Sequence, residues 1–261
     1  MNRIIGSIFH FNGMAVQSIG FSRYLPIGDV HIVAENLNNW GVDEILLLDI
    51  GAFEEGYKCD PDLVKKISKY VSVPLAVGGG INNKNDIYSL LQNGAEKVVI
   101  SSALYEKNLW IQNASKTFGA QSIIACLDYK VERNKICIYA KSGSQKIKKN
   151  VDDILQQLNE LEVGEIMFNS IDRDGQKNGF DIKTFKKIRQ RVNKPIIFCG
   201  GCGHPEHLLN LFSSGVVSGS IGNILNYKEH AIGIIKSFIK NNSKFDVRIE
   251  SDMYYAKNKN I

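Results

Sequence analysis

The chain has 261 residues, of which 44% are hydrophobic and 23% charged, and its 32 basic and 27 acidic side chains give a net charge of +5. No basic stripe typical of nucleic-acid binding, no apolar signal segment and no apolar run of the roughly 18 residues that span a membrane is present. The five cysteines lack the spacing of a secreted disulfide scaffold. We therefore expect a cytoplasmic protein that binds neither nucleic acid nor membrane.

Short strand-like runs alternate along the chain with longer segments in which apolar residues recur at helical spacing. The predicted strands span residues 4–9, 44–49, 74–77, 97–101, 122–128, 165–169, 195–199 and 217–221. The predicted helices span residues 29–40, 60–70, 85–93, 109–118, 151–161, 182–191, 205–213 and 228–240. A small hairpin is expected within residues 130–146, and a polar tail over 251–261. Eight alternating units predict a single (β/α)8 TIM barrel, with a doubly wound open sheet as the alternative.

The two halves of the chain repeat each other. Pro74–Ile81 recurs as Pro195–Cys202, an offset of 195 − 74 = 121, and Asp43–Leu48 recurs at the same offset as Gly164–Asn169. Several matches at one spacing indicate a duplicated half, and a half on its own would leave a sheet edge exposed. The predicted domain spans about residues 1–250, and its two half-barrels span about residues 1–120 and 121–250.

Glycines and small polar residues follow four of the predicted strands. The carboxyl ends of barrel strands form the functional face, and glycine there lets backbone amides approach an anion. Glycine can also serve only to turn the chain, but two clusters related by the repeat favour two phosphate sites that face each other. The candidate phosphate-binding residues are Gly79, Gly80, Ser101 and Ser102 in the first half and Gly200, Gly201, Gly222 and Asn223 in the second.

Three carboxylates follow strand ends at the same face. Asp128 ends the fifth predicted strand and is a candidate general acid or base, since no helix that it could cap follows at once. Asp49 and Asp174 are further residues of this face, although Asp49 could instead cap the next helix.

Two cysteines and two histidines superficially resemble a zinc site. They follow the pattern C-x2-C-x-H-x2-H at Cys199, Cys202, His204 and His207. Four ligands within nine residues would need a very tight loop, and the cysteines flank glycines that are assigned to phosphate. We therefore expect no metal site, and nothing else in the chain predicts a cofactor.

Charged residues stand at the opposite, N-terminal ends of four predicted strands. They are Arg3, Glu44, Lys97 and Glu165. Two cations and two anions there would converge on the barrel axis, where the desolvation of buried charges can cancel their attraction. The residues alone support an ionic plug and a functional gate equally.

These features together resemble the cyclase subunit of imidazole glycerol phosphate synthase over roughly residues 3–250. The matching runs are Asp43–Glu44, Leu48–Ile50, Val77–Ile81, Gly94–Ala95, Lys97–Val98 and Ser170–Gly175, of which the last is highly specific. The resemblance implies a doubly phosphorylated ribonucleotide in the mouth. It also implies ammonia from a separate glutaminase subunit at the N-terminal face, in a heterodimer, and a charged gate for that ammonia at Arg3, Glu44, Lys97 and Glu165.

The catalytic pair that the resemblance implies is incomplete. The family has an aspartate at the end of strand one and another at the end of strand five; Asp128 matches the second, but Phe9 stands at the first. Loss of one partner of an acid–base pair costs about two to four orders of magnitude in rate. His10 is adjacent, but alternation along a strand turns it to the other side. Gln17 replaces a lysine. The phosphate positions are altered at Ser101, Ser102, Asn169 and Asn223, whereas Gly175 matches.

A retained gate beside a compromised catalytic pair resembles the branch of this family found with bacterial surface-polysaccharide genes, as do residues 15–21 and 24–26. That branch implies a barrel that receives ammonia from a glutaminase for the amidation of a sugar, with or without a separate sugar-amidating enzyme. Two alternatives remain open at this point. One is a genuine cyclase of histidine biosynthesis that tolerates Phe9, and the other is a non-catalytic scaffold that activates a glutaminase.

Overall fold

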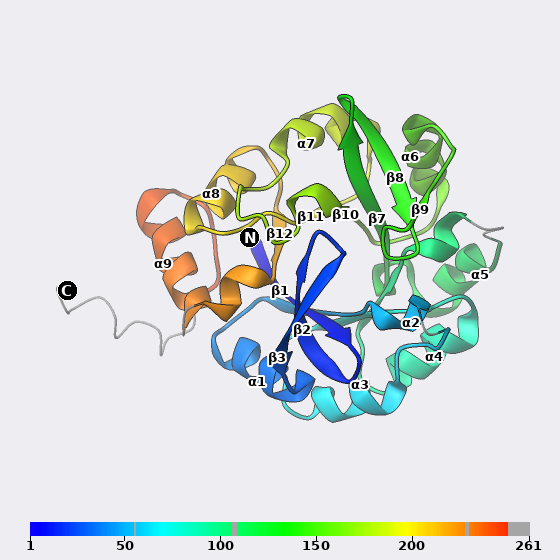
Figure 1. The fold of residues 1–261 in the computed structure, drawn as a ribbon, viewed down its shortest axis with the longest axis horizontal. Helices are drawn as coiled ribbons and strands as arrows, with labels where there is room; N and C mark the ends of the chain where they lie inside the picture. The colour runs from blue at the N-terminus through cyan, green and yellow to red at the C-terminus, as the bar shows by residue number, and fades with distance from the viewer. Residues whose placement is uncertain (55, 106–108, 228–229, 250–261) are drawn as a thin grey trace.

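A computed structural model describes residues 1–54, 56–105, 109–227 and 230–249. Eight parallel strands pair in the order β10-β11-β12-β1-β4-β5-β6-β7, and the pairing of β7 with β10 closes the ring (Figure 1). The barrel strands are β1 (Arg3–Phe11), β4 (Glu44–Asp49), β5 (Leu75–Gly78), β6 (Lys97–Ile100), β7 (Ile123–Glu132), β10 (Glu165–Ser170), β11 (Ile196–Cys199) and β12 (Ser218–Ile221). The predicted closed α/β barrel is confirmed.

Helices surround the barrel strands on the outside (Figure 1). They are α1 (Val30–Asn39), α2 (Gly51–Glu54), α3 (Pro61–Ser68), α4 (Lys84–Gln92), α5 (Leu109–Phe118), α6 (Val151–Glu160), α7 (Ile182–Ile188), α8 (Pro205–Ser213) and α9 (Ala231–Asn242). Short 3-10 turns are η1 (Ser102–Tyr105), η2 (Ala120–Ser122), η3 (Ile171–Arg173), η4 (Arg189–Arg191) and η5 (Asn223–Asn226). Polar N-caps such as Asp29, Asp60 and Asn83 accept backbone amides and fix where helices begin. Within the described ranges, no helix is long and apolar enough to cross a membrane.

Each half of the barrel carries a hairpin after its first strand. In the second half, β7 continues into β8 (Lys135–Ala140) and β9 (Gln145–Lys146), which confirms the predicted hairpin. In the first half, β1 continues into β2 (Met14–Ile19) and β3 (Arg23–Gly28), which were not predicted. Asn12 and Gly13 connect β1 to β2 with positive φ angles of 49° and 77°, as a two-residue hairpin turn requires.

The interior of the barrel is a separate apolar layer from the one between strands and helices. Its buried residues are Ile5, Leu46, Ala76, Val99, Ile124, Cys126, Met167, Ile197 and Cys199. Alternation along β1 and β7 continues this inward direction from Ile5 to Phe9 and from Ile124 to Asp128. Phe9 and Asp128 therefore occupy equivalent places at the mouth. The predicted tail at 251–261 and the start of the predicted last helix at 228–229 lie outside the described residues.

Candidate active site

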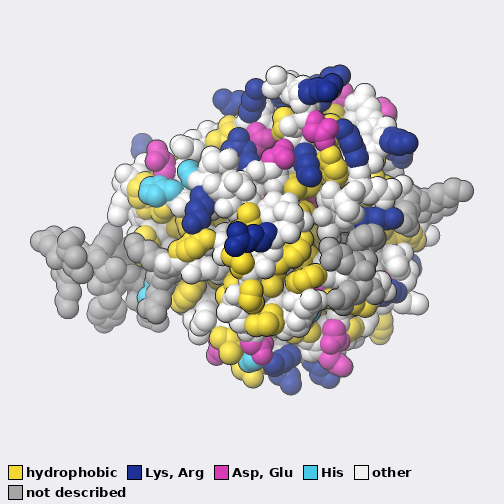
Figure 2. Space-filling model, viewed as in Figure 1, with side chains coloured by type: hydrophobic (Ala, Val, Ile, Leu, Met, Phe, Trp, Pro, Cys, Tyr) yellow, Lys and Arg dark blue, Asp and Glu magenta, His cyan; other side chains and the backbone are white. Residues whose placement is uncertain are grey.

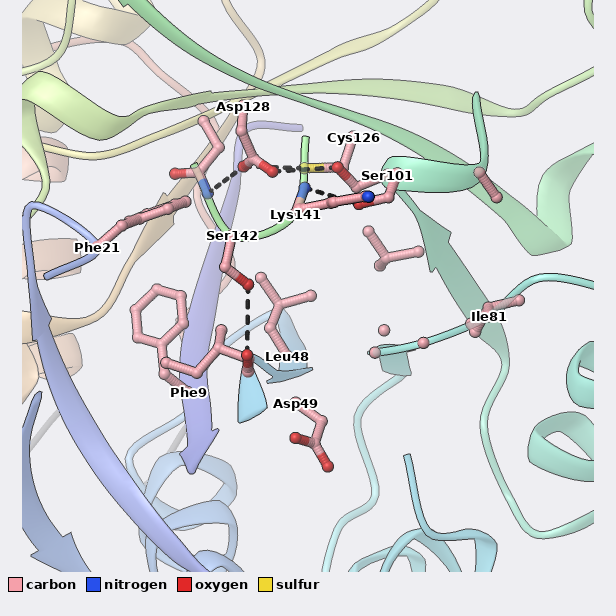
Figure 3. A pocket seen from close by; sticks show the side chains of 18 of the residues that line it. Phe9, Phe21, Leu48, Asp49, Ile81, Ser101, Cys126, Asp128, Lys141 and Ser142 are labelled. Carbon is pink, nitrogen blue, oxygen red and sulfur yellow. Dashed lines mark hydrogen bonds between the residues drawn. The ribbon is translucent and has the colours of Figure 1, made fainter. Parts of the chain in front are cut away.

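A cavity of about 300 Å³ opens at the mouth, over the carboxyl ends of β4, β5, β6 and β7 (Figure 3). The sequence-predicted residues that line it are Phe9, Asp49, Gly79, Gly80, Ser101, Ser102, Asp128 and Asn169. Three further lining residues come from the two hairpins and were not predicted: Phe21, Lys141 and Ser142. The first predicted phosphate cluster and Asp128 therefore share one cavity.

Asp128 is the buried acid of this cavity and is 7% exposed. Its Oδ2 accepts a hydrogen bond from Ser101 Oγ at 3.1 Å, and its Oδ1 accepts one from Asn169 Nδ2 at 2.9 Å. Burial raises the pKa of Asp128 to about 6, against these hydrogen bonds, which favour the charged form. A carboxyl group with this pKa can both accept and donate a proton near neutral pH.

Phe9 occupies the position opposite Asp128 and is 5% exposed. One side of the Phe9 ring lines the larger cavity, and the other side packs against Gly222. A Cβ atom added to Gly222 would lie 3.4 Å from Cε2 of Phe9. His10 points away from the mouth, as expected, and its Nδ1 lies 2.9 Å from Oδ2 of Asp49. Oδ1 of Asp49 in turn accepts the Tyr57 hydroxyl at 3.1 Å. His10 therefore contacts Asp49 and is not among the residues that line the cavity beside Phe9 and Asp128.

The second phosphate cluster surrounds a much smaller cavity, of about 20 Å³. Its lining includes the predicted residues Asp174, Gly175, Gly200, Gly201, Gly222 and Asn223, as well as Phe9. The β2–β3 hairpin contacts two of these residues: Ser18 Oγ donates to Asp174 Oδ2 at 2.6 Å, and Asn223 Nδ2 donates to the Ser18 carbonyl at 2.7 Å. Burial raises the pKa of Asp174 to about 6 as well. The two predicted phosphate clusters therefore do not form one continuous cavity.

The turn at residues 141–144 crosses the open cavity as a strap. The Lys141 amide donates to Ser102 Oγ at 2.9 Å, and Ser142 Oγ donates to the Ile50 carbonyl at 3.3 Å (Figure 3). Lys141, Ser142 and Gly143 all have positive φ angles, which gives the strap its tight curvature. Figure 2 shows this end of the barrel, where hydrophobic side chains gather around the middle, interspersed with Lys and Arg.

The four charged residues of the opposite end meet in one ring. Lys97 Nζ lies 2.8 Å from Glu44 Oε2 and 2.9 Å from Glu165 Oε2, while Arg3 lies 3.0 Å from Glu44 and also pairs with Glu165. Arg3 Nε further donates to Ser218 Oγ at 3.0 Å. The predicted convergence on the barrel axis is confirmed.

The ring leaves one buried acceptor. Oε1 of Glu44 has no hydrogen-bond partner within the described residues. Burial raises the pKa of Glu44, and the attraction of Lys97 and Arg3 only partly opposes that effect. Burial would also raise the pKa of Glu165, but hydrogen bonds and charge from Arg3 and Lys97 bring it below its ordinary value. The ring is neutral as a whole and asymmetric in its two carboxylates.

The two histidines of the C-x2-C-x-H-x2-H pattern accept hydrogen bonds from nearby backbone amides. His204 caps α8, where its Nδ1 accepts the Glu206 amide at 3.2 Å, and His207 Nδ1 accepts the Gly203 amide at 3.1 Å. Across the parts of the chain that the structure describes, no three His, Cys, Asp or Glu side chains come close enough to hold a metal ion.

The fold and these residues match a known group of proteins. The model of the histidine biosynthesis protein family matches residues 3–231. The chain belongs to this family. The imidazole glycerol phosphate synthase subunit HisF of Bacillus cereus (strain Q1) is 36% identical over 251 residues, which cover 95% of this chain and 98% of that protein. The protein of the same name from Staphylococcus saprophyticus is 36% identical over 241 residues, which cover 91% and 96%.

Within the histidine biosynthesis family, the chain is therefore a cyclase-like barrel of the imidazole glycerol phosphate synthase type. The matched residues 3–231 include the positions of the charged ring and of the mouth. At the mouth of this barrel, Phe9 places an aromatic ring opposite Asp128.

Proposed function

We propose that this barrel is the synthase-type subunit of a two-protein glutamine amidotransferase, and that it carries ammonia along its axis for the amidation of a surface-polysaccharide sugar. The observation that carries the proposal is the ring of Arg3, Glu44, Lys97 and Glu165 at one end of a barrel whose other end has Phe9 in the position opposite Asp128. The charged ring supports the entry of ammonia at that end of the barrel. The presence of Phe9 at the mouth supports a departure from cyclase chemistry.

The interior suits neutral ammonia better than ammonium. Ammonia that leaves a glutaminase docked at the N-terminal face would meet the ring, where Glu44 Oε1 can accept one of its N–H groups. The layer above, which includes Ile5 and Met167, is apolar, and an ion there would be strongly disfavoured. Ser7 and Ser220, with Oγ atoms 2.6 Å apart, offer the next polar contact below Phe9.

In the larger cavity of the mouth, Asp128 is a group that can move a proton. When ammonia attacks an electrophilic carbon, the nitrogen gains a positive charge and must lose a proton. The Asp128 carboxylate can take that proton, since its pKa of about 6 leaves it largely ionised at pH 7 and above. Phe9 can neither supply the second proton transfer nor stabilise a charged intermediate.

The experiment that tests this function is ammonia-dependent turnover of the cyclase substrate, phosphoribulosyl formimino-AICAR phosphate. We expect no turnover by the wild type and partial turnover by Phe9→Asp, which restores the paired carboxylates across the mouth. Phe9→Leu is the matched control, because it removes the ring without adding a carboxylate. Robust wild-type turnover would refute the departure from cyclase chemistry.

A genuine cyclase of histidine biosynthesis is the second candidate, and the 36% identity to subunits named for that reaction favours it. This candidate predicts that the gene restores growth to a cyclase-deficient histidine auxotroph. Growth with the wild type but not with Asp128→Asn would establish it, whereas growth only with Phe9→Asp would support the amidation-dedicated barrel.

A further inference from the structure

We propose that the β7–β8–β9 hairpin, together with α7, forms a docking surface for an acidic protein beside the mouth of the barrel. This deepens the proposed function, on which it rests only for the partner's role: the docked protein would be the enzyme that uses the ammonia. The surface consists of the Lys and Arg side chains of residues 130–149 and 183–187, which we call the basic surface.

The net charge of the chain is concentrated in the hairpin. Residues 130–149 contain seven Lys or Arg residues and one Glu, a net charge of +6, whereas the whole chain carries +5, so all its other residues together carry −1. Arg133, Lys135, Lys146, Lys148 and Lys149 are exposed. Figure 2 shows Lys and Arg side chains along the upper part of this face, with some Asp and Glu among them. Charge gathered in one short segment attracts a partner of opposite charge to that place.

The basic side chains are not needed to fold the hairpin. Alternation along β8 separates two sides, and Ile138 and Ala140 are buried on one of them. Lys135 and Tyr139 stand on the other side, where Tyr139 is paired with Lys146 of β9. Apolar burial therefore holds the hairpin in place, whereas the basic side chains repel one another and oppose folding. A partner of opposite charge would relieve that repulsion.

Little of the basic charge is neutralised within the chain. Glu132 is the acidic residue of the segment, and Lys146 already forms a salt bridge with it. Lys135, Lys148 and Lys149 form no ion pair within the residues that the structure describes. Their charges therefore remain available to a partner.

Helix α7 extends the basic surface. Nζ of Lys187 donates a hydrogen bond of 3.1 Å to the carbonyl of Asn134, at the tip of the β7–β8 hairpin. Lys183 and Lys186 are exposed on the same helix. The hairpin and the helix thus present one continuous basic area.

The basic surface borders the mouth of the barrel. Asp128 lines the larger cavity, and Lys130 follows it on the same side of β7, as alternation along a strand requires. At the other end of the hairpin, Lys141 and Ser142 line the same cavity. A protein docked on this surface would therefore lie where ammonia leaves the barrel.

The composition of the basic surface favours a protein over a membrane or a nucleic acid. Segments that lie on a bilayer carry bulky apolar side chains that enter the lipid, whereas Val131 is the one large apolar residue exposed within 130–149, a range that the structure describes completely. A nucleic acid would bring a row of phosphates past Glu132 and past Asp172, whose carboxylate accepts the Val131 amide at 2.7 Å. Mixed charges with one sign in excess are typical of surfaces that recognise a complementary protein.

The test is titration of the intact barrel into dye-labelled poly-L-glutamate, followed by fluorescence anisotropy at an ionic strength of about 0.15 M. We expect saturable binding that weakens as salt is added, because the contacts are between exposed charges. No binding under these conditions, or binding that salt does not weaken, would overturn the proposal.

Paired charge reversals locate the surface. Lys135→Glu combined with Lys148→Glu should weaken the binding of poly-L-glutamate about tenfold or more, because two attractions become repulsions. Lys65→Glu combined with Lys69→Glu is the matched control: both residues are exposed at α3, on the opposite edge of the barrel from the hairpin tip (Figure 1), and the change in net charge is the same. The control should change binding less than about twofold. Equal weakening by the two pairs would overturn the proposal, since net charge alone would then explain binding.

Two further probes separate the kinds of partner. Double-stranded DNA and phosphatidylglycerol vesicles are titrated against the same variants at the same ionic strength. Tighter binding of either probe than of poly-L-glutamate, lost in the hairpin variant and kept in the control, would overturn the assignment to an acidic protein. Because these titrations need neither ammonia nor a glutaminase, their failure is distinguishable from failure of the proposed function.

Discussion

Asp128 lies in a site that disfavours its own charge, and this has a measurable consequence for stability. Burial raises its pKa from the ordinary 3.8 to about 6, so the folded protein binds more protons than the unfolded chain between these values. Stability therefore falls as the pH rises through this window and stays reduced above it. A difference of about 2 pH units corresponds to a free energy on the order of 3 kcal/mol at pH 8.

Asp128→Asn should remove that cost. Asparagine has the shape of aspartate, can accept the bond from Asn169 with its oxygen, and can donate to Ser101 with its amide. We expect the variant to be more stable than the wild type by roughly 2–3 kcal/mol at pH 8 and nearly equal to it at pH 4, where Asp128 is protonated in the folded protein. Urea-induced unfolding followed by circular dichroism at both pH values measures the difference.

Asp153→Asn is the matched control, because Asp153 is exposed on α6 and its replacement removes one formal charge away from the mouth. Equal effects of Asp128→Asn at pH 4 and pH 8, or a loss of stability at pH 8, would refute the reasoning. The same variant also separates catalysis from scaffolding: it should abolish ammonia transfer at the mouth, whereas activation of a glutaminase by a scaffold would be indifferent to it.

Two further predictions concern stability. Lys97→Met leaves the ring with an unbalanced carboxylate and should lower the free energy of unfolding by about 3 kcal/mol. Adding Glu44→Gln should recover part of this loss, because it removes the unbalanced charge. A double variant that is less stable in urea than Lys97→Met alone would contradict this account. Gly79→Ala should destabilise by about 2 kcal/mol or more and reduce ligand binding, since φ is 138° and a Cβ would lie 2.6 Å from Asp49 Cβ. Gly13→Ala, with φ of 77° and open space around it, should lose less in thermal unfolding.

Much of the barrel could be predicted from the sequence, because its strands and helices are local patterns and its closure follows from the internal repeat. The convergence of Arg3 and Glu165 was predictable for the same reason, as both begin barrel strands. The β2–β3 hairpin was missed although Asn12–Gly13 between β-forming runs is a recognisable turn signal.

The division of the mouth could not be predicted. It depends on where the tips of two hairpins come to rest, and those contacts join residues more than 30 positions apart, such as Ser18 with Asp174 and Lys141 with Ser102. Local patterns do not encode such long-range packing. Lys141 could not be predicted to line the cavity, because an isolated lysine in a polar loop has the same sequence pattern whether it faces solvent or a cavity.

The two hairpins have a consequence for how this barrel could change during evolution. Each hairpin continues from the first strand of one half and forms hydrogen bonds with loops of the other half. The β2–β3 hairpin bonds to Asp174 and Asn223, and the turn after β8 bonds to Ser102 and Ile50. Each hairpin thus contacts loops of the other half. Substitutions in one hairpin can therefore close or reopen one ligand position while the opposite position and the shared barrel stay intact, which gives each half an independent route to a new ligand.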